Sequence, residues 1–185
     1  GRVTAGKGGL VKSMQGAAIV NGTLGHTGQT IISEGTLEVN GTITGPVELR
    51  ARGTLGGRFT LQDTITFEGA LNYEGCRLKA GGNVISSEKS MVLPGEVYLE
   101  IDAVMPQPGS PLSGYLQVEG DLTFRGTNYL TVNLGSKDYA EYEIARCTGT
   151  LTCDVTKLKT RGLEGINYDL EVRDGRLLLI VHESR

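Results

Sequence analysis

The chain has 185 residues and a formal net charge of −3 at pH 7, which gives no reason to expect nucleic acid or an acidic membrane surface as its partner. Its 28 glycines are not matched by prolines, of which there are only 5, so the composition excludes collagen and indicates many tight turns. No apolar run approaches the roughly 20 residues that a membrane-spanning helix needs, so membrane insertion is not expected.

One short unit recurs along the chain and consists of a glycine, a small or polar residue, and a leucine. Its clearest copy begins at Gly35 and places Leu37 and Val39 on one face of a short strand. That copy ends in Asn40-Gly41, a pair that is expected to form a turn. The intervals between copies have room for two short strands and their turns, which is typical of stacked β-coils. Further copies begin at Gly22, Gly53, Gly69, Gly120, Gly149 and Gly175.

Apolar residues alternate with polar ones through most of the chain, and glycine interrupts every candidate for an amphipathic helix. Such alternation predicts strands with one face in a core and the other in water. In the first half, the pairs expected on inward faces are Leu37 and Val39, Val47 and Leu49, Phe59 and Leu61, Ile65 and Phe67, and Leu71 and Tyr73. In the second half, strands are expected at Glu96–Asp102, Tyr115–Val118, Asp121–Phe124, Tyr129–Leu134, Glu141–Ala145, Tyr168–Val172 and Arg176–Val181.

The pattern of the sequence changes near Pro94, and a proline-rich loop follows from Met105 to Pro111. We therefore expect residues 1–94 to form the irregular repeats of a parallel β-helix. Residues 95–185 are expected to form a C-terminal β module that closes the stack, unless the two parts make one continuous domain. Within this module, Asp174-Gly175 predicts a tight hairpin. The alternative all-β fold is an antiparallel β-sandwich built from hairpins.

Two segments resemble the passenger-associated repeat of bacterial autotransporters. Gly9-Leu10-Val11-Lys12-Ser13 is similar to its Gly-Leu-x-Lys-x-Gly motif, and the segment 27–41 contains its Thr-Gly-x-Thr and Gly-Thr-Leu-x-Val motifs. The segment 115–135 is similar to the part that closes such passengers. The resemblance implies a right-handed β-helix that is secreted or displayed on a bacterial surface, without catalytic residues or a cofactor. Similar repeats also accompany large secreted polysaccharide-processing proteins.

Tyr98, Tyr115 and Tyr129 are the best candidates for binding a glycan, because a tyrosine offers a flat ring and a hydroxyl group to a sugar. The chain has no tryptophan, which would give a larger platform. Tyr142 and Tyr168 follow the phase of inward leucine and isoleucine residues and are expected in the core.

Cys147 and Cys153 flank a short loop that a disulfide bond could close in an oxidising compartment. The alternative is that both are buried thiols whose strands never meet. Cys76 has no neighbouring partner and is expected to be buried. No metal site is expected, since there is no Cys-x-x-Cys pair and His26 lies far from His182 in the sequence.

Charged residues also follow two of the expected strands. Glu96, Glu100 and Asp102 are placed on one face of a single strand, and two such carboxylates could serve glycan hydrolysis, although solvated faces usually look the same. The row Lys157, Lys159 and Arg161 could contact an acidic glycan or simply face water.

The sequence thus favours a non-enzymatic, extracellular scaffold with a structural or adhesive role, as a fragment of a larger secreted bacterial protein. Its expected partners are a glycan or a host or cell-surface protein, together with other domains of the same chain. The alternative is an accessory, glycan-binding part of a secreted polysaccharide-degrading enzyme.

Overall fold

The computed structural model describes residues 6–68, 75–103, 114–135 and 140–182. These residues form strands β1 to β20 and one 3-10 turn, η1 (Val155–Lys157), and they contain no α-helix. The protein is therefore all-β, which confirms the predicted fold class at that level. The expected inward pair Leu71 and Tyr73 lies outside the described residues.

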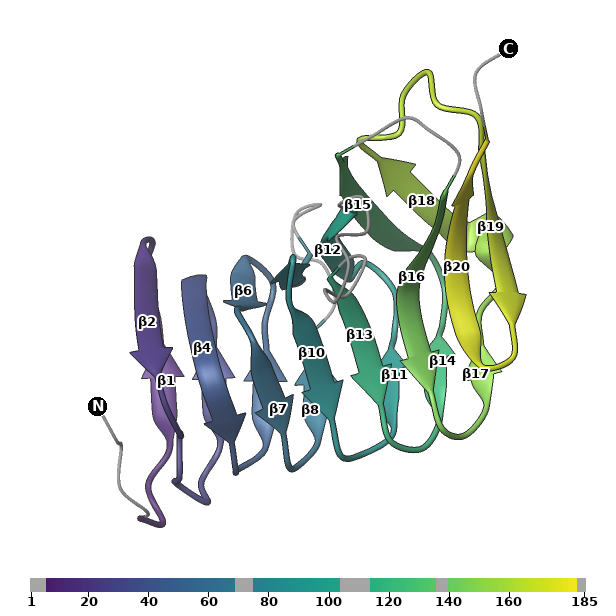
Figure 1. Ribbon diagram of the computed structural model, residues 1–185. Helices are drawn as coiled ribbons and strands as arrows, with labels where there is room; N and C mark the ends of the chain where they lie inside the picture. The colour runs from purple at the N-terminus through teal and green to yellow at the C-terminus, as the bar shows by residue number, and fades with distance from the viewer. Residues whose placement is uncertain (1–5, 69–74, 104–113, 136–139, 183–185) are drawn as a thin grey trace.

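The strands build three arrays (Figure 1). We name the first the wing-one ladder, and it contains β2 (Ala17–Asn21), β4 (Gly35–Ile43), β6 (Gly53–Gly56), β9 (Arg77–Gly81), β12 (Tyr98–Ala103), β15 (Asn128–Leu134) and β18 (Leu158–Arg161). The wing-two ladder continues from the end of β4 through β7 (Phe59–Leu61), β10 (Val84–Ser87), β13 (Tyr115–Val118), β16 (Ala140–Cys147), β20 (Arg176–Val181) and β19 (Tyr168–Arg173). The third array comprises two separate sheets, which are β1 (Leu10–Lys12), β3 (Thr30–Ile32), β5 (Val47–Leu49) and β8 (Ile65–Phe67), and then β11 (Met91–Leu93), β14 (Leu122–Phe124) and β17 (Leu151–Thr152).

The chain visits these arrays in turn, so each strand pairs with one from the next passage of the chain. Two copies of the recurring unit lie in register on the wing-one ladder, where the unit that begins at Gly35 pairs with the unit that begins at Gly53. Two more, which begin at Gly120 and Gly149, meet in the third array, where Leu122 is the partner of Leu151. All pairings among β1 to β18 are parallel. An antiparallel sandwich of hairpins, the alternative fold, does not describe these sheets.

The core is made of apolar side chains that repeat at the same position of successive strands. On the wing-one ladder the aligned residues are Leu37, Leu55, Leu78, Leu99 and Leu130. Each of them is at most 2% exposed. Because strand residues alternate in direction, a buried leucine at one position sends its two neighbours to the outer face. The burial of this column therefore determines which side chains face solvent on the wing-one ladder.

The pair Asn40-Gly41 does not form the turn that the sequence predicts. Strand β4 runs through both residues and bends there, so that its first part pairs with β6 and its last part pairs with β7. Glycine is required at this bend by close backbone contact rather than by a turn, because a Cβ atom on Gly41 would lie 2.1 Å from the carbonyl oxygen of Gly22.

The C-terminal strands reverse the direction of pairing. Strand β20 pairs antiparallel with β16, and β19 pairs antiparallel with β20. The hairpin predicted at Asp174-Gly175 is confirmed, and both residues have positive φ values, 52° and 70°. The predicted division between residues 94 and 95 stays a prediction, and parallel pairs such as β9 with β12 cross it.

The aligned leucines give a direct test of the packing. Replacing Leu37, which is 1% exposed, by alanine is expected to lower the free energy of unfolding by about 2–5 kcal/mol, because a buried side chain would leave a cavity. Its outward neighbour Glu38 is the matched control, and Glu38→Ala is expected to change that energy by about 0.5 kcal/mol or less. Urea denaturation followed by circular dichroism measures both values. Equal effects of the two changes would contradict the assigned register.

Candidate functional site

The structure brings together two of the three tyrosines that the sequence singles out. Tyr98 on β12 is the strand partner of Tyr129 on β15. Their rings stack with centroids 4.4 Å apart and planes 8° from parallel. Tyr115 belongs to β13 of the wing-two ladder and is not part of this pair.

Local sequence explains why Tyr98 stands on the outer face. Leu99 and Ile101 point into the core, so the intervening residues of β12 point outward. The ring of Tyr98 lies over Gly75, where an added Cβ atom would be 2.8 Å from Tyr98 Cε2 and 1.8 Å from the carbonyl oxygen of Glu96. A residue with a side chain at position 75 would thus displace the ring.

Two arginines flank the stacked rings. The guanidinium carbon of Arg77 on β9 lies 5.5 Å from the centroid of Tyr98. That of Arg161 on β18 lies 5.2 Å from the centroid of Tyr98 and 5.3 Å from that of Tyr129, which places it beside the pair. These distances are typical of cation–π contacts. We call Arg77, Tyr98, Tyr129 and Arg161 the arginine–tyrosine cluster.

The cluster leaves little ring surface for a sugar to stack on. Tyr98 is only 8% exposed, with Tyr129 against one part of its surface and the two guanidinium groups near it. The charge of Glu96 raises the pKa of Tyr129 above its ordinary value, with burial and a side-chain hydrogen bond to Glu96 acting in the same direction. The phenol of Tyr129 therefore stays protonated at neutral pH.

Tyr115 makes a separate contact with arginine on the wing-two ladder. The guanidinium carbon of Arg146 lies 4.8 Å from the Tyr115 ring centroid. Nη2 of Arg146 donates hydrogen bonds to the Tyr115 hydroxyl, at 2.9 Å, and to Gln117 Oε1, at 2.6 Å. Arg146 is held by these groups, so this tyrosine lies beside a cation that is already hydrogen-bonded.

An open groove of about 660 Å³ adjoins the cluster. It lies across the beginnings of the first wing-one strands and includes Arg77, so it shares a residue with the arginine–tyrosine cluster. Its volume is within the range of small-ligand sites in proteins. The lining residues are Gln15, Gly16, Ala17, Glu34, Gly35, Thr36, Arg52, Thr54, Gly75 and Arg77.

The acidic residues of this region are not arranged as a catalytic pair. Glu100 forms an ion pair with Lys79 at 3.0 Å, and Asp102 accepts a hydrogen bond from Asn133. Glu96 precedes β12 instead of lying on it, and its positive φ of 55° turns the chain there. The prediction that all three carboxylates share one strand is therefore wrong for Glu96. Among the described residues, no group of three histidine, cysteine or acidic side chains could hold a metal ion.

The prediction that Lys157, Lys159 and Arg161 alternate along one strand holds for only two of them. Lys157 ends the 3-10 turn η1 and pairs with Asp154, so it does not continue the strand. Lys159 and Arg161 belong to β18 and are exposed. Lys159 is the strand partner of Tyr129, which places a further cation next to the arginine–tyrosine cluster.

The three cysteines are free thiols. Cys147 ends β16, and Cys153 follows β17. Burial raises the pKa of Cys76 to about 12. Burial, with the charge of Asp154, raises that of Cys153 to about 11. A bond between Cys147 and Cys153 stays a prediction, which mass spectrometry of the oxidised protein can check.

Comparisons with known proteins give no family for this chain. No family model matches it, and no curated protein matches its sequence. Within the described residues there is no helix both long enough and apolar enough to cross a membrane.

The raised pKa of Cys153 predicts how this thiol reacts. Because only the thiolate reacts, alkylation of Cys153 by iodoacetamide is expected to speed up about tenfold per pH unit between pH 8 and pH 10. Peptide mapping by mass spectrometry gives the rate at each pH. In denaturant the same thiol is expected to react faster at pH 8, since its pKa returns to the usual range. A rate in the folded protein that levels off below pH 9 would contradict the assigned burial.

Proposed function

We propose that the chain is a right-handed parallel β-helix. The support is the order in which it visits the three arrays, since each return places a strand parallel to one from the previous passage. Connections between parallel strands are right-handed in nearly all proteins. The aligned core leucines give such coils the continuous apolar interior that stacked repeats need.

The function that this geometry supports best is an extracellular structural or adhesive scaffold of bacterial origin, part of a larger secreted or surface-displayed protein. The observation that carries it is the continuous parallel pairing of the wing-one strands from β2 to β18. Most of the described chain belongs to such stacked strands, which form an extended surface. The resemblance of residues 9–13 and 27–41 to autotransporter passenger repeats favours the same role. Such a scaffold presents its outer faces to a glycan or a cell-surface protein and holds other domains of the same chain.

Residues 95–185 act in this proposal as the closing module. Strand β20 occupies the edge of β16 in the antiparallel sense. An exposed strand edge is open to pairing with other chains. Strand β20 covers the edge of β16 and places Leu177 and Leu179, which are fully buried, in the core, while β19 becomes the last strand of the wing-two ladder.

A second function is favoured by the groove and the arginine–tyrosine cluster. Together they put polar, cationic and aromatic groups on one face of the wing-one ladder. This arrangement suits an accessory, glycan-binding part of a secreted polysaccharide-degrading enzyme, whose active site would lie on another domain.

Truncation tests the closing module. A chain that ends at residue 163 lacks β19 and β20, and it is expected to form oligomers or aggregates because the edge of β16 is uncovered. Size-exclusion chromatography with light scattering measures its state, and the full chain is the control. A truncated chain that stays monomeric, with an unchanged melting temperature, would show that β19 and β20 do not close the stack.

An activity assay tests the non-enzymatic role. The purified chain is expected to release no reducing ends from neutral or acidic polysaccharides, because its carboxylates are paired with basic or amide groups rather than with each other. Sustained turnover that copurifies with the chain, and is lost in Glu100→Gln, would overturn the scaffold proposal.

A further inference from the structure

The two arginines of the arginine–tyrosine cluster lie against aromatic rings instead of carboxylates. Several basic side chains face carboxylates, as in the ion pairs of Arg173 with Glu141 and of Lys79 with Glu100. Within the described residues, Arg77, Lys159 and Arg161 are exposed and form no ion pair. The arginine–tyrosine cluster and its neighbour Lys159 thus present three cations that form no direct ion pair, although Glu96 acts on Tyr129 and the whole chain has a net charge of −3.

The tyrosines position two of these cations for one ligand. Both guanidinium carbons lie within 5.5 Å of the Tyr98 ring centroid, Arg77 at 5.5 Å and Arg161 at 5.2 Å. Contact with an aromatic ring orients a guanidinium group without using its N–H donors. Those donors remain able to form the paired hydrogen bonds that carboxylate and sulfate groups accept.

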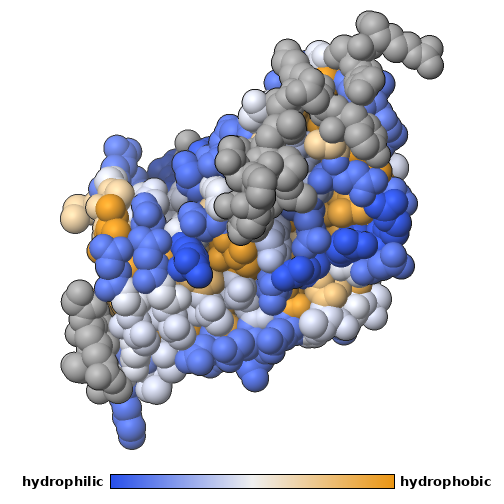
Figure 2. Space-filling model, in the orientation of Figure 1, coloured by the Kyte–Doolittle hydropathy of each residue, from blue (hydrophilic) through white to orange (hydrophobic). Residues whose placement is uncertain are grey.

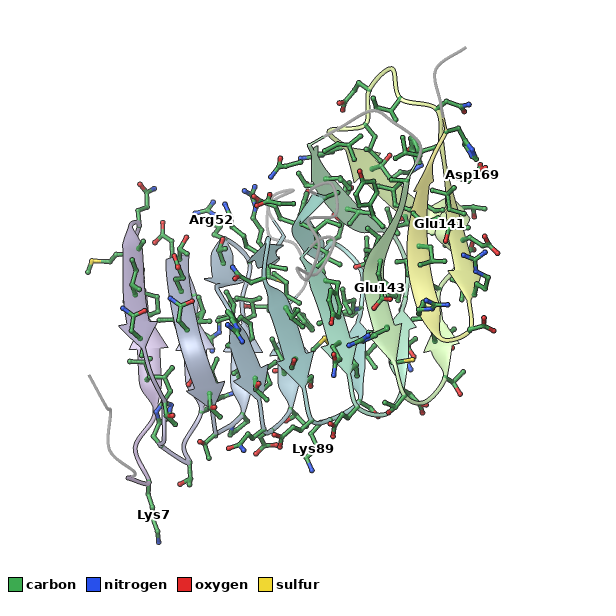
Figure 3. All side chains as sticks on the ribbon, viewed as in Figure 1. Lys7, Arg52, Lys89, Glu141, Glu143 and Asp169 are labelled. Atoms are coloured by element: carbon green, nitrogen blue, oxygen red, sulfur yellow. The ribbon has the colours of Figure 1, made fainter. Side chains whose placement is uncertain are left out.

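The groove extends this charged surface toward the N-terminal strands. Arg77 belongs to both the groove and the cluster, and Arg52 also lines the groove. Figure 3 shows Arg52 at the upper end of the strands, whereas Lys89 lies at the lower edge of the molecule. An elongated ligand that enters the groove at Arg52 can therefore continue past Arg77 to Arg161.

The observations favour a sugar polymer over a nucleic acid. Proteins that bind single-stranded nucleic acid stack bases on exposed aromatic faces. Here the two rings stack on each other, and Tyr98 is only 8% exposed. An acidic sugar needs no free ring face, because guanidinium groups can bind its charged substituents.

We propose that the outer face of the wing-one ladder binds an acidic polysaccharide, with Arg77 and Arg161 contacting its carboxylate or sulfate groups beside the Tyr98–Tyr129 pair. This inference rests on the glycan-binding function proposed above. It adds that the glycan is acidic and names the residues that bind its charged groups. Lys159 adds electrostatic attraction for the anionic ligand that does not depend on the orientation of a hydrogen bond.

Binding of polygalacturonate oligosaccharides, measured by isothermal titration calorimetry, tests the inference. The full chain is expected to bind them and to bind a neutral galactan of the same length at least about tenfold more weakly. Arg77→Gln and Arg161→Gln are each expected to weaken polygalacturonate binding about tenfold, because each removes a charge-assisted contact. Arg161→Lys keeps the charge but not the paired donors and is expected to lie between these values. Lys89→Gln removes a positive charge at the far edge and is the matched control, expected to bind like the unmodified chain.

The outcomes separate this inference from the function on which it rests. Equal affinity for polygalacturonate and neutral galactan would overturn the inference and leave glycan binding standing, whereas binding of neither would overturn both. Unchanged affinity in the two arginine variants, with melting temperatures equal to that of the unmodified chain, would also overturn the inference. So would equally tight binding of a single-stranded oligonucleotide of the same charge, which would indicate attraction for any polyanion.

Discussion

The structure depends on the parallel register of its inward leucines. Once Leu99 lies opposite Leu130 in the core, the alternation of strand residues leaves no choice for the outer face, and Tyr98 must lie opposite Tyr129. A one-residue slip would bury the tyrosines and expose the leucines. The same burial that stabilises the fold therefore assembles the arginine–tyrosine cluster, so the geometry of the cluster is set by the core and not by its own contacts alone.

Period-two alternation was sufficient to predict many strands, including Tyr115–Val118 and Arg176–Val181 with the bounds that the structure has. The turn expected from the pair Asn40-Gly41 was wrong, because a pair with strong turn preference also suits a bend where backbones pass closely. Pairing between distant strands was harder to predict. Arg77 lies beside Tyr98 because the connections between their strands have the right lengths. A local sequence pattern does not show which residues of two distant strands will pair.

The tyrosines show how position in the strand changes the meaning of a residue. Tyr142 is fully buried, as its phase with Ile144 predicts. Tyr98 is also nearly buried, yet it stands on the outer face, where another ring and two guanidinium groups cover it instead of core side chains. The alternation of the sequence predicts which tyrosines point inward and which point outward. It does not predict whether an outward ring is exposed to solvent or covered by neighbouring side chains. For that reason the sequence pointed to tyrosine platforms, whereas the structure draws attention to the arginines beside them.

The two ends of the strand stack are chemically unequal. At one end, β1 and β2 are the outermost parallel strands, and Val11, Met14 and Ile19 are 62%, 73% and 61% exposed; Figure 2 shows hydrophobic colour over β2. At the other end, β20 runs against β16 and occupies its edge. A further parallel strand could pair with the unpaired backbone groups at the first end, where apolar side chains are also exposed. At the second end, the hairpin of β19 and β20 already occupies the edge of β16. The stack thus has a polarity: at its C-terminal end the wing-two ladder turns antiparallel, while β17 and β18 remain the last strands of their sheets.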